Sequence, residues 1–165
     1  MTGEPFADVL AANERYARDF SLRGLTGRAA KGLAVVTCID TRIEPLAMLG
    51  LAPGDAKILR NAGARVTDDV LATLAVTRHL LGVERAMVVA HTDCRMSAES
   101  PDELHEAIAS AGGPDTRALP FAVRAGREET LRGDVDLIRS SPYLGGLEAG
   151  GFLYDVETGR LRRVC

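Results

Sequence analysis

The sequence has no tryptophan, only two lysines (Lys31 and Lys57) and an aromatic fraction of 4%. Its formal net charge is −3, so it lacks the basic surface that binds nucleic acid, and we expect no nucleic-acid partner. No stretch approaches the ~20 consecutive apolar residues that cross a bilayer, and the first twenty residues lack the apolar segment of a signal peptide. We therefore expect a cytoplasmic protein that does not bind membranes.

Cysteine is also scarce, with Cys38, Cys94 and Cys165 as the three examples. An odd number of cysteines in a chain without a secretion signal indicates reduced thiols. Metal binding or catalysis is then a better explanation of the cysteines than a disulfide.

The chain is long enough to form one domain with a substantial core, because 46% of its 165 residues are apolar. We expect residues 1–165 to form this single domain, with 1–30 as a helical arm and linker. Helical periodicity, together with capping residues at several ends, predicts helices at 6–20, 44–51, 67–82 and 100–113, and a helix in two pieces at 119–141.

Continuous apolar runs at 33–39, 56–63 and 84–91 predict strands that are buried on both faces. Residues 150–164 form the clearest hairpin pattern, with a turn at 157–159. Strands that alternate with helices predict an α/β fold with a mainly parallel sheet and flanking helices. We expect the strand order 2-1-3-4, with a C-terminal antiparallel edge strand.

Three side chains with metal-binding chemistry follow two of these strands. Cys38 ends the first strand, and His91 and Cys94 end the third, in the segments "CIDTR" and "HTDC". In a sheet of order 2-1-3 these two strands are neighbours, ~4.8 Å apart, and ligands bind at the carboxyl ends of such strands. Two thiolates each ~2.3 Å from one zinc ion lie ~3.8 Å apart, so all three side chains can converge on one ion.

Three protein ligands are typical of a catalytic zinc site, which keeps its fourth position open. Cys165 offers an alternative, a closed structural site, but it lies beyond the hairpin, and we favour the open site. His79 is predicted on a helix and His105 on a solvated helix face, so we expect neither to be a ligand. Each motif alone is weak, since a single cysteine at a strand end is usually a packing residue.

Asp40 and Arg42 alternate with Cys38 along the extended chain. A carboxylate two residues from a zinc ligand can reach the metal or its water, and a nearby guanidinium can hold that carboxylate ionised and turned away. We therefore expect Asp40 and Arg42 to act as a catalytic pair, with Asp40 as a fourth metal ligand in a closed state.

Together these residues resemble the β-class carbonic anhydrases, and the short chain is similar to compact bacterial and mycobacterial members. That family carries C-x-D-x-R followed by H-x-x-C, as in residues 38–42 and 91–94 here. "RNAG" at 60–63 and the C-terminal hairpin are also similar, so the resemblance extends from about residue 30 to the end.

The resemblance implies a lyase, carbonate dehydratase, that hydrates carbon dioxide to bicarbonate and a proton with Zn²⁺ held by Cys38, His91 and Cys94. It places Arg60 and Asn61 near the active site or a subunit interface. It also implies a homodimer, or a tetramer, in which the N-terminal helix packs on a partner subunit.

One position departs from the family pattern: Arg95 follows the second cysteine, where the family typically has glycine. If that position needs a positive φ or a close backbone approach, an arginine reshapes the cleft, and we expect Arg95 to narrow or polarise it. Two other functions remain open. One is a non-catalytic thiolate–zinc or redox-sensing module, and the other is hydrolysis of a CO2-like molecule such as COS or CS2.

Overall fold

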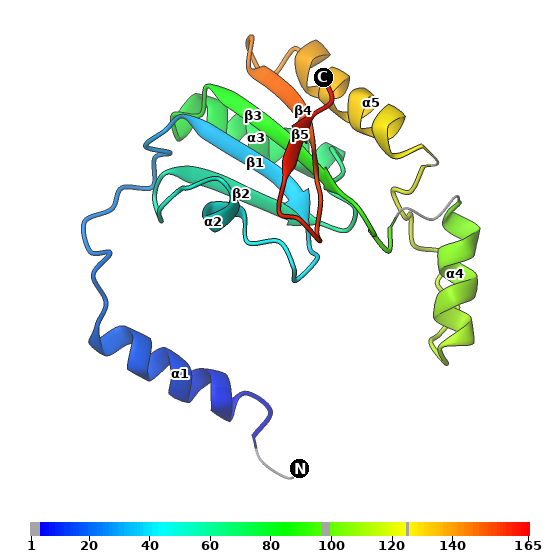
Figure 1. Ribbon diagram of the computed structural model, residues 1–165, viewed down its shortest axis with the longest axis horizontal. Helices are drawn as coiled ribbons and strands as arrows, with labels where there is room; N and C mark the ends of the chain where they lie inside the picture. The colour runs from blue at the N-terminus through cyan, green and yellow to red at the C-terminus, as the bar shows by residue number, and fades with distance from the viewer. Residues whose placement is uncertain (1–3, 97–99, 125) are drawn as a thin grey trace.

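The computed structural model describes residues 4–96, 100–124 and 126–165. Its centre is a five-stranded sheet of order β2-β1-β3-β4-β5, as Figure 1 shows. The strands, in chain order, are β1 (Leu33–Cys38), β2 (Ala56–Asn61), β3 (Arg85–His91), β4 (Glu148–Tyr154) and β5 (Leu161–Arg163). The first four run parallel and β5 is antiparallel to β4, so the predicted order and the antiparallel edge strand are both confirmed.

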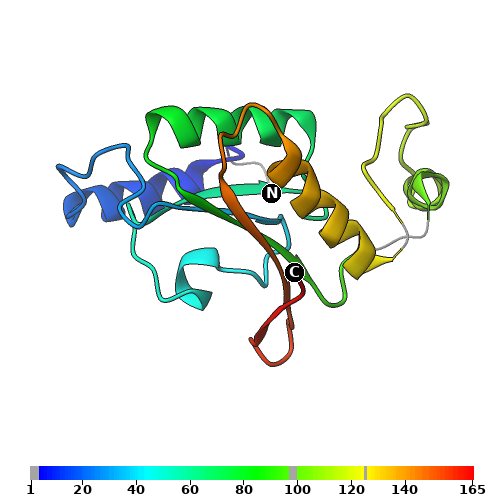
Figure 2. The same ribbon diagram turned by 90° about the horizontal axis from the view of Figure 1, so that it is seen from above.

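The helices, in chain order, are α1 (Ala7–Arg18), α2 (Pro45–Met48), α3 (Asp68–Leu80), α4 (Pro101–Ser110) and α5 (Arg127–Ser140). In Figure 2, α3 and α5 lie on one face of the sheet and α2 lies on the other. The larger core lies under α3 and α5, where Leu74 and Val135 pack against strand residues such as Val36 and Val88. All six residues of β1 are buried, as its continuous apolar run predicts.

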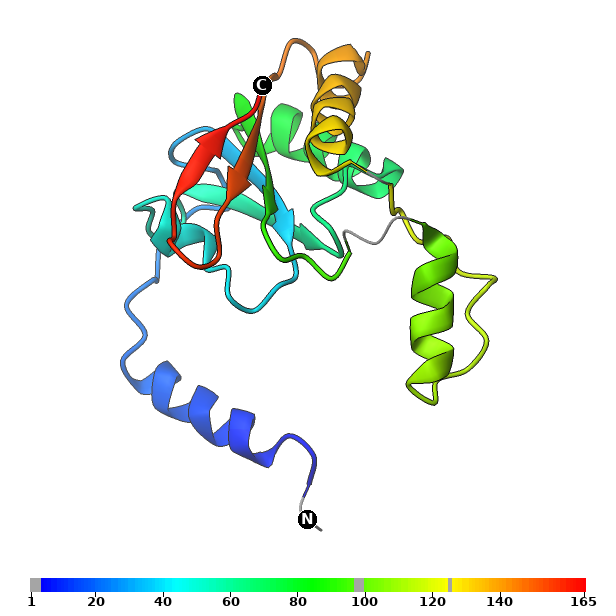
Figure 3. The same ribbon diagram turned by 45° about the vertical axis from the view of Figure 1, so that its right-hand side comes forward.

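Two helices project from this body, as Figures 1 and 3 show. α1 has no buried residue. α4 begins with the predicted capping box, in which the Ser100 hydroxyl accepts from the Glu103 N–H and the Glu103 carboxylate accepts from the Ser100 N–H. Within the described residues, no helix is long and apolar enough to cross a membrane.

The prediction of a two-piece helix over 119–141 is wrong for its first piece. Residues 119–124 form no helix, and only α5 is helical. The Val123 N–H donates to the Phe121 carbonyl only two residues back, as in a γ-turn, and the Phe121 ring packs on His105 with ring centroids 4.9 Å apart. This segment therefore contacts α4 through Phe121 and forms no helix.

Parallel strands place their carboxyl ends along one edge of the sheet. The register pairs Cys38 at the end of β1 with Asn61 at the end of β2, and β3 ends at His91 beside them. The loops that follow these strands therefore meet at this edge, which is where the candidate site lies.

Candidate metal centre

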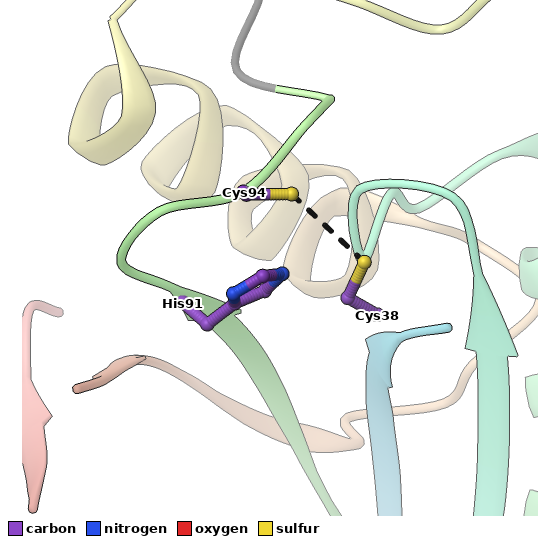
Figure 4. Close-up of side chains that lie close together, drawn as sticks. All are labelled: Cys38, His91 and Cys94. Atoms are coloured by element: carbon purple, nitrogen blue, oxygen red, sulfur yellow. Dashed lines mark hydrogen bonds between the residues drawn. The ribbon is translucent and has the colours of Figure 1, made fainter. Parts of the chain in front are cut away.

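Cys38, His91 and Cys94, called the ligand triad below, point toward one another in Figure 4. The two sulfur atoms lie 3.9 Å apart, and one ligand atom of each residue lies within 4.8 Å of the others. Cys38 and His91 are almost completely buried, with 3% and 1% of their surface exposed. Among the described residues, His91 Nε2 is a buried nitrogen without a hydrogen-bond partner. A buried, unsatisfied nitrogen beside two thiols is the arrangement that a metal ion would satisfy.

The orientation of the His91 ring is fixed by its other nitrogen. His91 Nδ1 lies 2.8 Å from the Thr92 carbonyl oxygen. A carbonyl can only accept, so Nδ1 must donate, and in the neutral ring the lone pair is then on Nε2. This second hydrogen bond is the usual way in which proteins orient a metal-binding histidine.

The Cys38 and Cys94 thiols form a hydrogen bond that shifts the pKa values of both. The hydrogen bond between the sulfur atoms is the largest cause of both shifts, lowering the pKa of Cys38 and raising that of Cys94. Burial is the largest single influence on His91 and opposes its charged form, but the neighbouring Cys38, the Thr92 carbonyl and Asp40 together raise the pKa of His91. The opposite shifts of the two cysteines leave one proton shared between the two sulfur atoms, and this proton must leave when a metal binds both as thiolates.

The donor set fits zinc. Thiolate sulfur and imidazole nitrogen are preferred zinc ligands, and the sulfur separation of 3.9 Å matches the ~3.8 Å expected for two thiolates on one tetrahedral ion. Among the described residues, Cys165 does not belong to the group that could hold a metal. It lies instead against Gly151 of β4, where its sulfur is 2.8 Å from the point at which a side chain on that glycine would begin.

Asp40 lies beside the ligand triad and is held by Arg42. The guanidinium donates two hydrogen bonds to the Asp40 carboxylate, at 3.0 and 2.8 Å, and the Arg42 backbone N–H donates a third at 2.9 Å. These bonds hold the pKa of Asp40 well below its usual range and raise that of Arg42. One Asp40 oxygen lies 3.9 Å from His91 Nε2, so the ionised carboxylate is next to the atom that faces the metal position.

Asp93 was missed by sequence reasoning. Its carboxylate accepts from Arg42 Nη1 at 2.7 Å and its carbonyl accepts from Arg42 Nη2 at 3.0 Å. Asp93 has a positive φ of 51°, an uncommon conformation that aspartate tolerates better than most residues. Arg42 thus connects the two loops that carry the ligand triad, a contact whose only sequence signal is the aspartate before Cys94.

Arg60 and Asn61, at the end of β2, both contact the loops of the site. The Arg60 guanidinium donates to the carbonyls of Cys38 and Asp40, at 2.9 and 2.7 Å, and so supports the backbone that carries both side chains. The Asn61 side chain donates to the Arg65 carbonyl and accepts from the Arg65 N–H. These hydrogen bonds go to backbone groups, so they support the loops of the site and indicate no direct part in the reaction.

Arg95 does not occupy the strained backbone position that would make an arginine reshape the cleft. Arg95 is exposed, and the positive φ in this loop is at Asp93. The arginine therefore causes no strain of the kind that a required glycine would relieve. That Arg95 narrows or polarises a cleft stays a prediction.

The other two histidines lie on helices and bond elsewhere. His79 Nε2 is 2.8 Å from the Tyr143 carbonyl oxygen, and His105 Nδ1 is 2.9 Å from the Thr116 hydroxyl. Neither belongs to the group that could hold a metal.

Comparison with known proteins agrees with this site. Residues 33–112 match the family model described as carbonic anhydrase. The chain is 35% identical to β-carbonic anhydrase 1 of Mycobacterium tuberculosis over 162 residues, which cover 95% of this chain and 96% of that protein. It is 32% identical to carbon disulfide hydrolase of an Acidianus strain, over 88% of this chain and 83% of that protein. The crystal structure of a carbonic anhydrase from Streptococcus mutans superposes with a TM-score of 0.89 at 36% identity and covers all of both chains. The chain belongs to the β-carbonic anhydrase family.

Proposed function

We propose that this protein catalyses the reversible hydration of carbon dioxide to bicarbonate and a proton, with one zinc ion held by Cys38, His91 and Cys94. The observation that carries the proposal is the buried ligand triad with an ionised carboxylate, that of Asp40, held beside it. A bound zinc ion would supply Lewis acidity that makes water a nucleophile near neutral pH.

Asp40 and Arg42, which lie beside the triad, would orient the attacking water molecule. The Asp40 carboxylate can accept a hydrogen bond from a water molecule at the open side of the triad and so orient its lone pair toward carbon dioxide. Arg42 keeps Asp40 ionised and fixes its two oxygens through paired hydrogen bonds. Neither His79 nor His105 is placed to relay the proton, so we expect the proton to leave through water or buffer.

A second candidate is hydrolysis of carbon disulfide, because a carbon disulfide hydrolase matches most of the chain at 32% identity. CS2 is a linear, CO2-like molecule, and the same triad would serve its attack by water. Carbon disulfide and carbon dioxide differ in their products, since CS2 hydrolysis releases hydrogen sulfide.

A paired assay separates these functions. We expect zinc-loaded protein to hydrate CO2 in a stopped-flow indicator assay with kcat/KM above about 10⁴ M⁻¹s⁻¹, the lower end of the usual enzyme range. We expect much slower hydrogen sulfide release from CS2. Fast sulfide release with slow CO2 hydration would reverse the assignment, and zinc-loaded protein without either activity would indicate a non-catalytic zinc or redox module.

We also propose that the protein forms a homodimer through α1. This helix has no buried residue, although Phe6, Val9, Leu10, Tyr16 and Phe20 lie on or beside it, each more than a third exposed. It projects from the body in Figures 1 and 3. A second copy of the chain that covers this face would remove a large apolar surface from water.

If α1 forms the dimer interface, changes in this helix should weaken dimer formation. Deleting residues 1–20, or introducing Leu10→Glu, should raise the dimer dissociation constant at least about tenfold, because burying one leucine is worth about 1.5–3 kcal/mol. Light scattering across a dilution series measures this change. Ala11→Glu places the same charge on the opposite side of α1 and serves as the control. A wild-type protein that is monomeric at micromolar concentration would contradict the proposal.

A further inference from the structure

The loop over residues 61–65, between β2 and α3, has an unusual backbone. Gly63 and Ala64 have positive φ angles of 88° and 58°, and Ala64 is buried with 2% exposed. A side chain on Gly63 would begin 3.2 Å from Met96 Cβ, so the loop is pressed against the segment that carries Cys94. A buried alanine in the left-handed region persists only where its surroundings hold it there.

This loop reaches the ligand triad through one backbone group. The Gly63 N–H donates to Cys38 Sγ, with nitrogen and sulfur 3.4 Å apart. Hydrogen bonds to a metal-binding thiolate orient the ligand and adjust how strongly its sulfur donates to the metal. The position of the 61–65 loop therefore matters to the metal centre.

A buried ion pair holds the loop from the other side. Arg65 Nε and Nη2 donate to the two carboxylate oxygens of Asp134 on α5, at 2.7 and 2.9 Å. The two side chains are 11% and 3% exposed. The third arm of the guanidinium, Nη1, donates to the Ala122 carbonyl, and the Asn61 side chain bonds both the N–H and the carbonyl of Arg65. One arginine thus ties the loop to α5 and to the segment before it.

The ion pair and the ligand triad share a cavity. Arg65 and Asp134 line a small cavity of about 50 Å³ together with His91 and Cys94. Stability alone is a weak explanation for the pair, because well-packed apolar residues often replace a buried ion pair without loss. Its place beside the metal ligands indicates a different role.

We propose that the Arg65–Asp134 ion pair is a positioning device for the metal centre, which holds the 61–65 loop so that the Gly63 N–H stays on Cys38 Sγ. This inference depends on the proposed zinc ligands. Arg65 and Asp134 are positioning residues that act through Gly63 and touch neither metal nor substrate.

The test uses the full chain with zinc and with cobalt as the probe metals. The double variant Arg65→Met with Asp134→Leu replaces the pair by apolar side chains of similar size, and Asp134→Asn removes only the charge. Glu128→Gln is the control. Glu128 lies on the same helix α5 and forms an ion pair with Arg162 of β5, but this pair is exposed. Circular dichroism and Tm show that each variant is folded.

Zinc affinity and the cobalt spectrum give the result. We expect both ion-pair variants to bind zinc about 10- to 100-fold more weakly in chelator competition, the usual effect of losing an outer-shell partner. We also expect their thiolate-to-cobalt charge-transfer band to shift, while Glu128→Gln matches the wild type in both measurements.

Two results would overturn the inference. Folded variants with wild-type zinc affinity and an unchanged cobalt band would show that the pair does not act on the metal centre, even if their Tm is lower. A wild-type protein that binds no zinc would overturn the proposed function, and this inference with it, so the two failures are distinguishable.

Discussion

Cys38→Ser and His91→Ala should each reduce bound zinc from about one ion per chain to less than about 0.1, because either change leaves only two strong ligands of the three that a catalytic zinc site needs. His91 also supplies the buried Nε2 that faces the two sulfur atoms. Elemental analysis of gel-filtered protein measures the effect, and CO2 hydration should fall in parallel.

Cys165→Ser is the matched control, since it removes the third thiol of the chain. Cys165 lies outside the group that could hold a metal, so this variant should keep its zinc. Full zinc content in both Cys38→Ser and His91→Ala would show that the metal is held elsewhere.

Arg42→Ala should lower kcat/KM for CO2 hydration by about 10- to 100-fold while zinc content stays the same. The Arg42 side chain makes two hydrogen bonds to Asp40 and two to Asp93, so its loss frees the carboxylate beside the triad and disconnects the two loops. A freed Asp40 can turn toward the open side of the triad and compete with water there. Asp40→Asn should also be slow, because water then loses its anionic acceptor.

Stopped-flow hydration with zinc analysis of the same samples measures this prediction. Arg117→Ala removes an arginine from an exposed ion pair with Asp115 and should leave the rate unchanged. Wild-type rates in both Arg42→Ala and Asp40→Asn would remove the pair from the mechanism.

The titration of Asp40 does not affect the rate near neutral pH, because its pKa is lowered, first by the Arg42 side-chain hydrogen bonds. A carboxyl group with a depressed pKa is ionised above its ordinary value of about 3.9, and its contribution is lost only as pH falls through the lowered pKa. Asp40 is thus ionised at every pH near neutrality. We expect CO2 hydration to be low near pH 7 and to rise toward alkaline pH, because two thiolates would offset the charge of a bound zinc ion and so raise the pH at which its water loses a proton. A rate that is flat or falls over this range would contradict the expectation.

The sequence predicts the sheet well because its strands are local patterns. The apolar runs that end at Cys38 and His91 indicate buried strands, and the alternation with helices indicates that these strands are parallel. The metal ligands follow from the same reasoning, since the carboxyl ends of neighbouring strands lie together whatever the loops do. The first piece of the expected 119–141 helix does not form, and Phe121 packs on His105 of α4, a contact that no local pattern reveals.

The contacts that hold the ligands were beyond sequence reasoning. Arg65 and Asp134 are 69 residues apart, and only the folded chain brings α5 against the 61–65 loop. Asp93 accepts hydrogen bonds from Arg42 while its own backbone is left-handed. The neighbouring sequence does not indicate this conformation. Long-range hydrogen bonds of this kind depend on how loops pack, whereas strand ends depend on the sheet alone.

We expect one zinc ion on Cys38, His91 and Cys94 to make this chain a CO2 hydratase. The most direct measurement titrates zinc into metal-free protein and records the initial rate of CO2 hydration by stopped flow. The rate should rise linearly to a plateau at about one zinc per chain, and it should not rise with Cys38→Ser. A wild-type rate that stays at the buffer value after one equivalent of zinc has bound would contradict this expectation.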